Sequence, residues 1–286
     1  MTATAVKQSR RRGRRRVFNT VNVSAVAIAL ITAAPIYWLL VNSITPTGEM
    51  GTLPPTFWPA DPTLTHYEEA FGQHAFGRYL FNSLLVACLA TTTVLGLSLF
   101  AGYALARMPV RGKGPIMVFL LMISVFPTIA VVTPLYMIER SLGLLNTHIG
   151  LILPYVAFNL PFAVWIMRNY LKDLPYELEE SAQIDGASTT RTVWSVILPT
   201  VRPGLFAVGV FTFTACLTEF LMAMTFSSED EMRTVPVGIA LFGSEFEVPF
   251  GTIFAASVAT VLPIAVLALV FRRAVVAGMT AGAVKG

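Results

Sequence analysis

Six long apolar blocks constrain this chain more than any other feature of its sequence. A helix needs about 20 residues to cross the hydrocarbon core of a bilayer, about 30 Å thick, and each block is close to or above that length. The blocks are residues 21–43, 80–106, 115–138, 150–167, 204–226 and 252–271. Backbone groups in lipid must be satisfied internally, and no alternating pattern of about ten residues indicates a barrel. The sequence therefore predicts an all-α polytopic membrane protein with six transmembrane helices.

Composition and internal prolines refine this prediction. Only 13% of the residues are charged, against about a quarter in soluble proteins, so most of the surface is expected to face lipid. Prolines inside the blocks, among them Pro127 and Pro134 in the third, indicate kinks that neighbouring helices can accommodate. The fourth block is the shortest and is interrupted by Asn159-Leu160-Pro161.

The positive charges indicate an orientation. Seventeen of the 20 lysines and arginines lie in the N-terminal arm, in the connections after the second and fourth blocks, and in the C-terminal tail. The other three, Arg78, Arg140 and Arg233, lie on the opposite side of the predicted membrane. Loops rich in lysine and arginine face the cytoplasm. Both termini of this multi-pass protein are therefore predicted to be cytoplasmic.

This topology divides the chain into segments with different roles. They are a basic N-terminal arm (1–20), the first span (21–43), an extracytoplasmic segment (44–79), a core (80–271) and a C-terminal tail (272–286). The core includes a cytoplasmic loop, residues 168–203, and an outer loop, residues 227–251. The basic arm directly precedes a span, so we interpret it as a topology determinant that touches anionic membrane lipid, not as a nucleic-acid site.

The chain carries no recognisable catalytic or cofactor motif. Cys88 and Cys216 fall inside predicted spans without metal-ligand spacing, and the three histidines show no ligand-like pairing. The sequence has no Walker A motif, no dinucleotide-binding GxGxxG and no nucleophile elbow. We therefore expect no enzymatic activity, no resident metal and no cofactor bound by this chain.

The cytoplasmic loop is much longer than a turn and carries helix signals of its own. A proline followed by three glutamates suits the first turn of a helix, and Gly186 can end that helix in a left-handed turn. Ser188 can cap a second helix, which Pro199 and Pro203 are expected to end. The sequence thus predicts two short helices that lie flat beneath the membrane and dock on a partner.

This loop also carries a resemblance to a known family. Glu180-Ser181-Ala182-Gln183-Ile184-Asp185-Gly186-Ala187, followed by Leu198-Pro199, resembles the EAA loop of bacterial ABC-importer permeases, E-A-A-x-x-D-G-A…L-P. Residues 81–84 (FNSL), 101–107 (AGYALAR), 160–162 (LPF) and 278–286 (GMTAGAVKG) are similar to segments of carbohydrate permeases of the maltose-transporter MalG type. The resemblance runs from residue 79 to the end. Two positions depart from it: Ser181 replaces an alanine, and Leu217-Thr218-Glu219-Phe220 stands where relatives often read W-N-E/D-F.

The resemblance implies a subunit of an importer in the bacterial cytoplasmic membrane. Its implied partners are a second, different permease subunit, two ATP-binding-cassette ATPase subunits that use ATP and Mg²⁺, and an extracytoplasmic solute-binding protein. The implied ATPase-coupling residues are Glu179, Glu180, Ser181, Ala182, Asp185, Gly186 and Ala187. The end of the tail, Val284, Lys285 and Gly286, is expected to contact the ATPases as well.

The outer loop is implied to contact the solute-binding protein. Gly243, Ser244 and Glu245 are its candidate contact residues. The loop also contains an apolar run, residues 235–242, that solvent exposure alone does not explain. The alternative interpretation is a helix that packs on the bundle.

Glu219 is the only ionisable residue predicted within a span. A charged side chain at that depth costs about 2.5–3.5 kcal/mol on insertion scales, so it is expected to face the bundle or a water-filled path. Glu219, Thr218 and Asn159 are candidates for either the translocation path or a helix interface.

The predicted function is import of a sugar driven by the separate ATPase subunits, with a disaccharide such as maltose or trehalose as cargo. The same architecture can carry another cargo, such as a glycerol phosphate or a polyol. A secondary transporter requires ionisable groups within its spans, and only Glu219 qualifies. A channel requires pore-lining selectivity elements, and the sequence does not mark any.

Overall fold

The computed structural model describes residues 3–243 and 248–272 of the 286-residue chain. Every regular element in these residues is a helix, which confirms the predicted fold class. The chain divides into two compact units. One is Met1–Ala70 with Pro249–Val258, and the other is Phe71–Val248 with Ala259–Gly286.

In the first unit, a single long helix joins the basic arm to the first predicted span. This helix is α1 (Ala3–Ser43), and a short 3-10 turn (Thr47–Glu49) and α2 (Thr65–Gly72) follow it. His66 on α2 is buried and donates from Nε2 to the carbonyl oxygen of Thr45 at 2.8 Å. The hydroxyl of Thr252, in the first turn of α12 (Phe250–Val270), donates to Glu69 at 2.7 Å. These bonds fix the segment that follows α1 to the start of α12.

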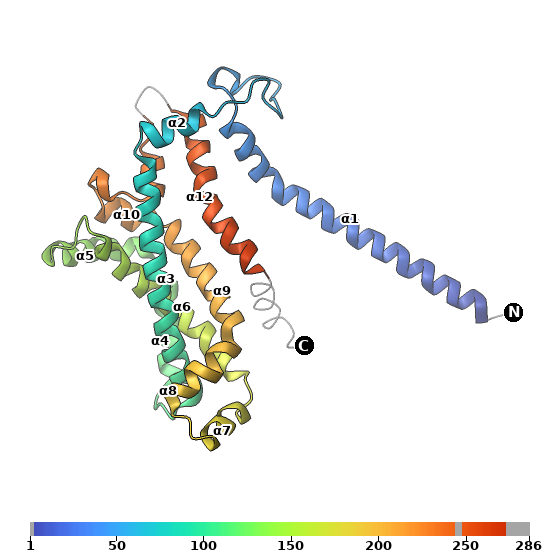
Figure 1. Ribbon diagram of the computed structural model, residues 1–286, viewed down its shortest axis with the longest axis vertical. Coiled ribbons are helices and arrows are strands. Elements are labelled where there is room, and N and C mark those ends of the chain that lie inside the picture. Colours follow the sequence, from blue (N-terminus) through green and yellow to red (C-terminus); the bar gives the residue numbers. More distant parts are fainter. Residues whose placement is uncertain (1–2, 244–247, 273–286) are drawn as a thin grey trace. The chain divides into compact units, whose positions relative to one another are not determined.

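Three long helices form the centre of the second unit. They are α3 (Phe76–Arg107), α6 (His148–Lys172) and α9 (Leu198–Leu217), and each packs against the other two (Figure 1). The approach of α3 to α6 is close at Gly102, where an added Cβ atom would lie 2.9 Å from Cβ of Met167. Small residues allow this approach, because helices in lipid associate through tight packing and not through the hydrophobic effect.

Two buried clusters hold this bundle together. One joins α3, α6 and the start of α9 at the end where α3 finishes, and it includes Tyr103, Met167, Leu171 and Ile197. The other lies towards the opposite end and includes Val86, Tyr155, Leu217 and Phe226. The fourth predicted span is continuous despite Asn159-Leu160-Pro161, and it is longer at both ends than the sequence indicated.

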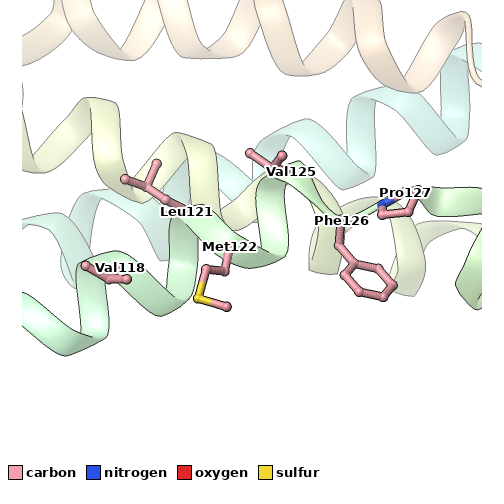
Figure 2. Close-up of a pocket in the computed structure, with 6 residues that line it drawn as sticks. All are labelled: Val118, Leu121, Met122, Val125, Phe126 and Pro127. Carbon is pink, nitrogen blue, oxygen red and sulfur yellow. The ribbon is translucent and has the colours of Figure 1, made fainter.

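The third predicted span is broken. It comprises α4 (Lys113–Val125) and α5 (Thr128–Ser141), which meet at an angle of 92°. Pro127 has no N–H to donate, and it disfavours the helical conformation at the residue before it. Phe126 is accordingly extended, with φ −67° and ψ 132°. A hollow of about 510 Å³ lies at this break. Figure 2 shows the six residues that line it, which are Val118, Leu121, Met122, Val125, Phe126 and Pro127.

The fifth predicted span is also interrupted. The α9 helix ends at Leu217, and a separate short helix, α10 (Leu221–Phe226), follows after a break at residues 218–220. Beyond α10, the outer loop forms a 3-10 turn (Asp230–Met232) and α11 (Val235–Ala240). Glu219 therefore lies between two helices and not within one, which corrects the prediction from the sequence.

The number of spans depends on the broken third block. Five helices in the described residues are long and apolar enough to cross a membrane, and the bent pair α4–α5 makes a sixth if it counts as one span. The five are Asn22–Ser43, Phe76–Arg107, His148–Lys172, Thr189–Leu217 and Phe250–Val270.

Candidate functional site

The loop at residues 168–203 contains the predicted helix and the predicted glycine turn. The first helix is α7 (Glu177–Ile184), which we call the coupling helix. Gly186 has φ +79°, in the left-handed region. Its N–H donates to the carbonyl of Gln183 at 3.0 Å, and the N–H of Ala187 donates to the carbonyl of Ala182 at 2.9 Å. This pair of bonds is a Schellman motif, and it satisfies carbonyls that the helix end leaves free.

The second helix of the loop starts as predicted but does not end as predicted. The Ser188 side chain accepts from the N–H of Arg191, and α8 (Thr189–Thr192) begins there. Pro199 and Pro203 do not terminate it, because a π-helical turn (Val193–Ile197) carries the chain straight into α9. The N–H of Leu198 donates to the carbonyl of Val193, five residues back. The prediction of a separate helix lying flat beneath the membrane is therefore wrong for this segment: it is the start of the fifth span.

The predicted coupling residues divide into an outer and an inner group. Glu180, Ser181, Asp185 and Gly186 are exposed, Ala187 is intermediate, and Glu179 and Ala182 are buried. The hydroxyl of Ser181 donates to the carbonyl of Glu177 at 2.7 Å, so it is held within the helix. Ile184 is 87% exposed on the same helix.

Glu179 contacts the end of α3 instead of pointing outward. Its Oε1 lies 2.7 Å from Nε of Arg107, and its Oε2 accepts from the hydroxyl of Tyr103 at 2.8 Å. Arg107 also donates from Nη2 to the carbonyl of Leu174 at 2.7 Å, and its guanidinium lies 4.0 Å from the ring centroid of Tyr176. Neither Tyr103 nor Arg107 was a predicted site residue, although their i, i+4 spacing places them on one helical face.

The outer loop is bonded to the opposite end of α3. Asn82 is fully buried and donates from Nδ2 to the carbonyls of Glu231 and Arg233, at 2.8 and 3.0 Å. Ser83 accepts from the N–H of Val235 at 2.8 Å. Asn82 and Ser83 belong to the FNSL segment that carried part of the family resemblance. In the structure, two residues of that segment are hydrogen-bonded to the outer loop.

The apolar run of the outer loop packs on the bundle. Val235, Val237 and Gly238 of α11 are buried, and an added Cβ atom at Gly238 would lie 2.2 Å from the ring of Tyr79 on α3. This packing agrees with the alternative interpretation of residues 235–242, which was a helix that packs on the bundle. Of the candidate contact residues for the solute-binding protein, Gly243 is exposed, and Ser244 and Glu245 lie outside the described residues.

Glu219 caps the start of α10 and is bonded to α6. Its Oε1 accepts from the N–H of Met222 at 2.9 Å, and its Oε2 accepts from the N–H of Ala223 at 3.1 Å. The Tyr155 hydroxyl donates to Oε2 at 2.8 Å. Three donors from the chain itself therefore surround this carboxylate, which supports a structural role at the junction of α6, α9 and α10.

The two residues predicted beside Glu219 make other contacts. Thr218 is exposed, and its hydroxyl donates to the carbonyl of Thr214 at 2.9 Å. Asn159 donates from Nδ2 to the carbonyl of Tyr155 at 2.8 Å. Asn159 and Glu219 thus share Tyr155 as a hydrogen-bond partner, whereas Thr218 bonds back to the last turn of α9. The tail residues Val284, Lys285 and Gly286 lie outside the described residues.

Comparison with known proteins gives concordant results. Residues 94–280 match the family described as "Binding-protein-dependent transport system inner membrane component". The chain is 37% identical to a sulfoquinovosyl glycerol transport system permease of Agrobacterium fabrum, with 92% of each chain covered. It is 38% identical to a trehalose/maltose transport system permease of Thermococcus litoralis, covering 92% of this chain and 95% of that one. A crystal structure of a bacterial ABC transporter that imports alginate contains a chain of the same fold, with a TM-score of 0.74, 22% identity, and 90% and 96% covered.

Proposed function

This chain belongs to the family of binding-protein-dependent transport system inner membrane components, and on that premise we propose that it is a permease subunit of an ATP-binding-cassette importer for a sugar. The observation that carries the cargo class is the similarity, over about nine-tenths of both chains, to permeases named for trehalose, maltose and sulfoquinovosyl glycerol. We propose a disaccharide such as trehalose or maltose as the cargo. A glycoside of glycerol is the second candidate, because one of these relatives is named for such a compound.

The coupling helix is proposed to dock on two ATP-binding-cassette ATPase subunits. The sequence has no nucleotide-binding motif of its own, so ATP and Mg²⁺ are assigned to those partners. The exposed residues Glu180, Asp185 and Ile184 supply charge and apolar area for this contact. The tail ending in Val284, Lys285 and Gly286 is proposed as a second contact with the same subunits.

Two further partners follow from the family and from the surface. The family description names dependence on a binding protein, and we assign its contact to the outer loop around Gly243. Val118, Met122 and Val125 on α4 are more than half exposed, which suits contact with lipid or with a second permease subunit. Arg168, Lys172 and Arg191 flank the coupling helix in the sequence, which supports a cytoplasmic location for it and for both termini.

Reconstitution tests this proposal. The complex of both permease subunits and the ATPases, placed in liposomes with the solute-binding protein, is expected to take up radiolabelled trehalose or maltose only when ATP and Mg²⁺ are present on the ATPase side. This chain alone is expected to show neither uptake nor ATP hydrolysis. A calorimetric screen of the binding protein against maltose, trehalose, sulfoquinovosyl glycerol, glycerol phosphate and a polyol identifies the cargo. ATP-dependent uptake by the chain alone would refute the proposal.

A cysteine at Gly243 is expected to crosslink to the solute-binding protein in the ATP-bound complex, because Gly243 is exposed within the outer loop, which Asn82 and Ser83 hold in place. The measurement uses an amine-to-thiol reagent on the Gly243→Cys variant, with Cys88 and Cys216 replaced by alanine. Ser181→Cys on the coupling helix is the matched control and is expected to give no such product. Absence of the Gly243 product in every nucleotide state would leave the outer loop with a packing role alone.

A further inference from the structure

Two adjacent glutamates of the coupling helix differ in their exposure to solvent. Glu180 is exposed, and Glu179 is only 6% exposed. A buried carboxylate is stable only when it is paired and hydrogen-bonded. Glu179 has both kinds of partner, the guanidinium of Arg107 and the hydroxyl of Tyr103. The family motif begins at Glu180, so the motif alone does not explain why a second acid precedes it.

Arg107 holds the coupling helix and the segment just before it at three separate points. It pairs with Glu179, donates to the carbonyl of Leu174 and lies over the ring of Tyr176. The Arg107 side chain is itself 3% exposed. A planar guanidinium can pair with a carboxylate, donate to a carbonyl and stack on a ring at once, whereas a lysine ammonium is a point charge. The site therefore selects arginine for its shape as well as for its charge.

The same helix that carries Arg107 also carries the anchor of the outer loop. The α3 helix is unbroken from Phe76 to Arg107. Asn82 bonds the outer loop near one end, and Tyr103 bonds the coupling helix near the other. At 1.5 Å per residue, these two side chains start about 32 Å apart along one helix axis. A rigid helix bonded to both loops is a physical connection between the two faces of the membrane.

We infer that Arg107 and Tyr103 are positioning residues that fix the coupling helix to the end of α3 through Glu179, so that a movement of the coupling helix is transmitted to α3. This inference rests on the proposed function, and it assigns different roles to the two glutamates. Glu180 belongs to the surface that meets the ATPase. Glu179 belongs to the joint inside the permease.

The test separates assembly from coupling in the reconstituted complex. Arg107→Lys keeps the positive charge and loses the planar guanidinium group. Glu179→Gln keeps the side-chain shape and loses the negative charge, and Tyr103→Phe removes one hydroxyl. Two quantities are measured: the amount of ATPase subunit that co-purifies, and the ratio of ATP hydrolysis with binding protein and maltose or trehalose to hydrolysis without them. Arg111→Gln removes an exposed positive charge nearby and controls for effects on topology.

For Arg107→Lys and Glu179→Gln, we expect wild-type co-purification and a stimulation ratio lower by on the order of tenfold, within the range that coupling residues produce. Tyr103→Phe is expected to lower the ratio less, and Arg111→Gln is expected to leave it unchanged. The double variant Arg107→Lys with Glu179→Gln is expected to have a stimulation ratio no lower than that of the more impaired single variant, because both changes break the same contact.

Three other results have distinct meanings. Wild-type stimulation in both Arg107→Lys and Glu179→Gln overturns the inference and leaves the proposed function intact. Should those two variants fail to assemble, Tyr103→Phe decides, and an unchanged ratio in that assembled variant overturns the inference. A wild-type complex that no tested sugar and binding protein stimulate counts against the proposed function instead.

Discussion

Gly186→Val is expected to reduce retention of the ATPase subunits by about tenfold or more and to abolish uptake, because a β-branched residue resists the left-handed backbone conformation. No atom lies within 4 Å of the position of an added Cβ atom at Gly186, so the effect comes from the φ of +79° and not from a clash. A left-handed conformation costs an ordinary residue about 1–2 kcal/mol, and about 1.4 kcal/mol corresponds to a factor of ten in affinity. Losing this turn also loses the two bonds that end the coupling helix.

Gly186→Asn is the matched control for this prediction. Asparagine adopts the left-handed conformation more readily than other residues with a side chain, and it also occurs at this position of a Schellman motif. Retention of the ATPase subunits is therefore expected to stay near that of the wild type. The measurement is the ratio of ATPase to permease after affinity purification, followed by uptake in liposomes. Equal retention and uptake in the valine and asparagine variants would show that the turn does not matter for docking.

The second large effect is expected at Glu219. Glu219→Leu leaves the N–H groups of Met222 and Ala223 and the hydroxyl of Tyr155 without their acceptor. A buried donor left unpaired costs about 1–3 kcal/mol, so the three together are enough to disrupt the junction of α9 and α10. We expect the leucine variant to lose most assembled complex and all uptake, as measured by size-exclusion yield, thermal midpoint and transport.

Two further substitutions at this junction separate the contributions. Glu219→Gln keeps one carbonyl-type oxygen and the side-chain shape, so it can still accept from two of the three donors. It is expected to assemble and to retain measurable uptake. Tyr155→Phe removes the bond to α6 and leaves the cap of α10 intact, so its loss of stability is expected to be the smallest. Wild-type assembly and uptake in Glu219→Leu would exclude both a structural and a pathway role for this carboxylate.

Local and lipid-imposed features could be predicted from the sequence. Long apolar blocks must form helices in a membrane, whatever their neighbours are. The left-handed turn at Gly186 and the cap at Ser188 depend on bonds within a few residues, and both are present as predicted. The family resemblance rested on the motif in the same stretch and on four short segments elsewhere, and the match of residues 94–280 bears it out. Each of these signals is complete within one segment of the chain.

The tertiary structure decided features that depend on distant partners. A sequence does not say which of Glu179 and Glu180 turns inward, because that depends on where Arg107 arrives from the end of α3. The contacts of Glu219 at the break also depend on a distant partner, because the hydroxyl of Tyr155 that donates to Glu219 comes from α6. Pro199 was expected to end a helix, but the π-helical turn before it lets the helix continue into α9. Val193 and Ile197 of this turn are buried in one cluster with residues of α3 and α6. Local preferences set where a helix can start or stop, and contacts between helices far apart in the chain decide which of those options the protein takes.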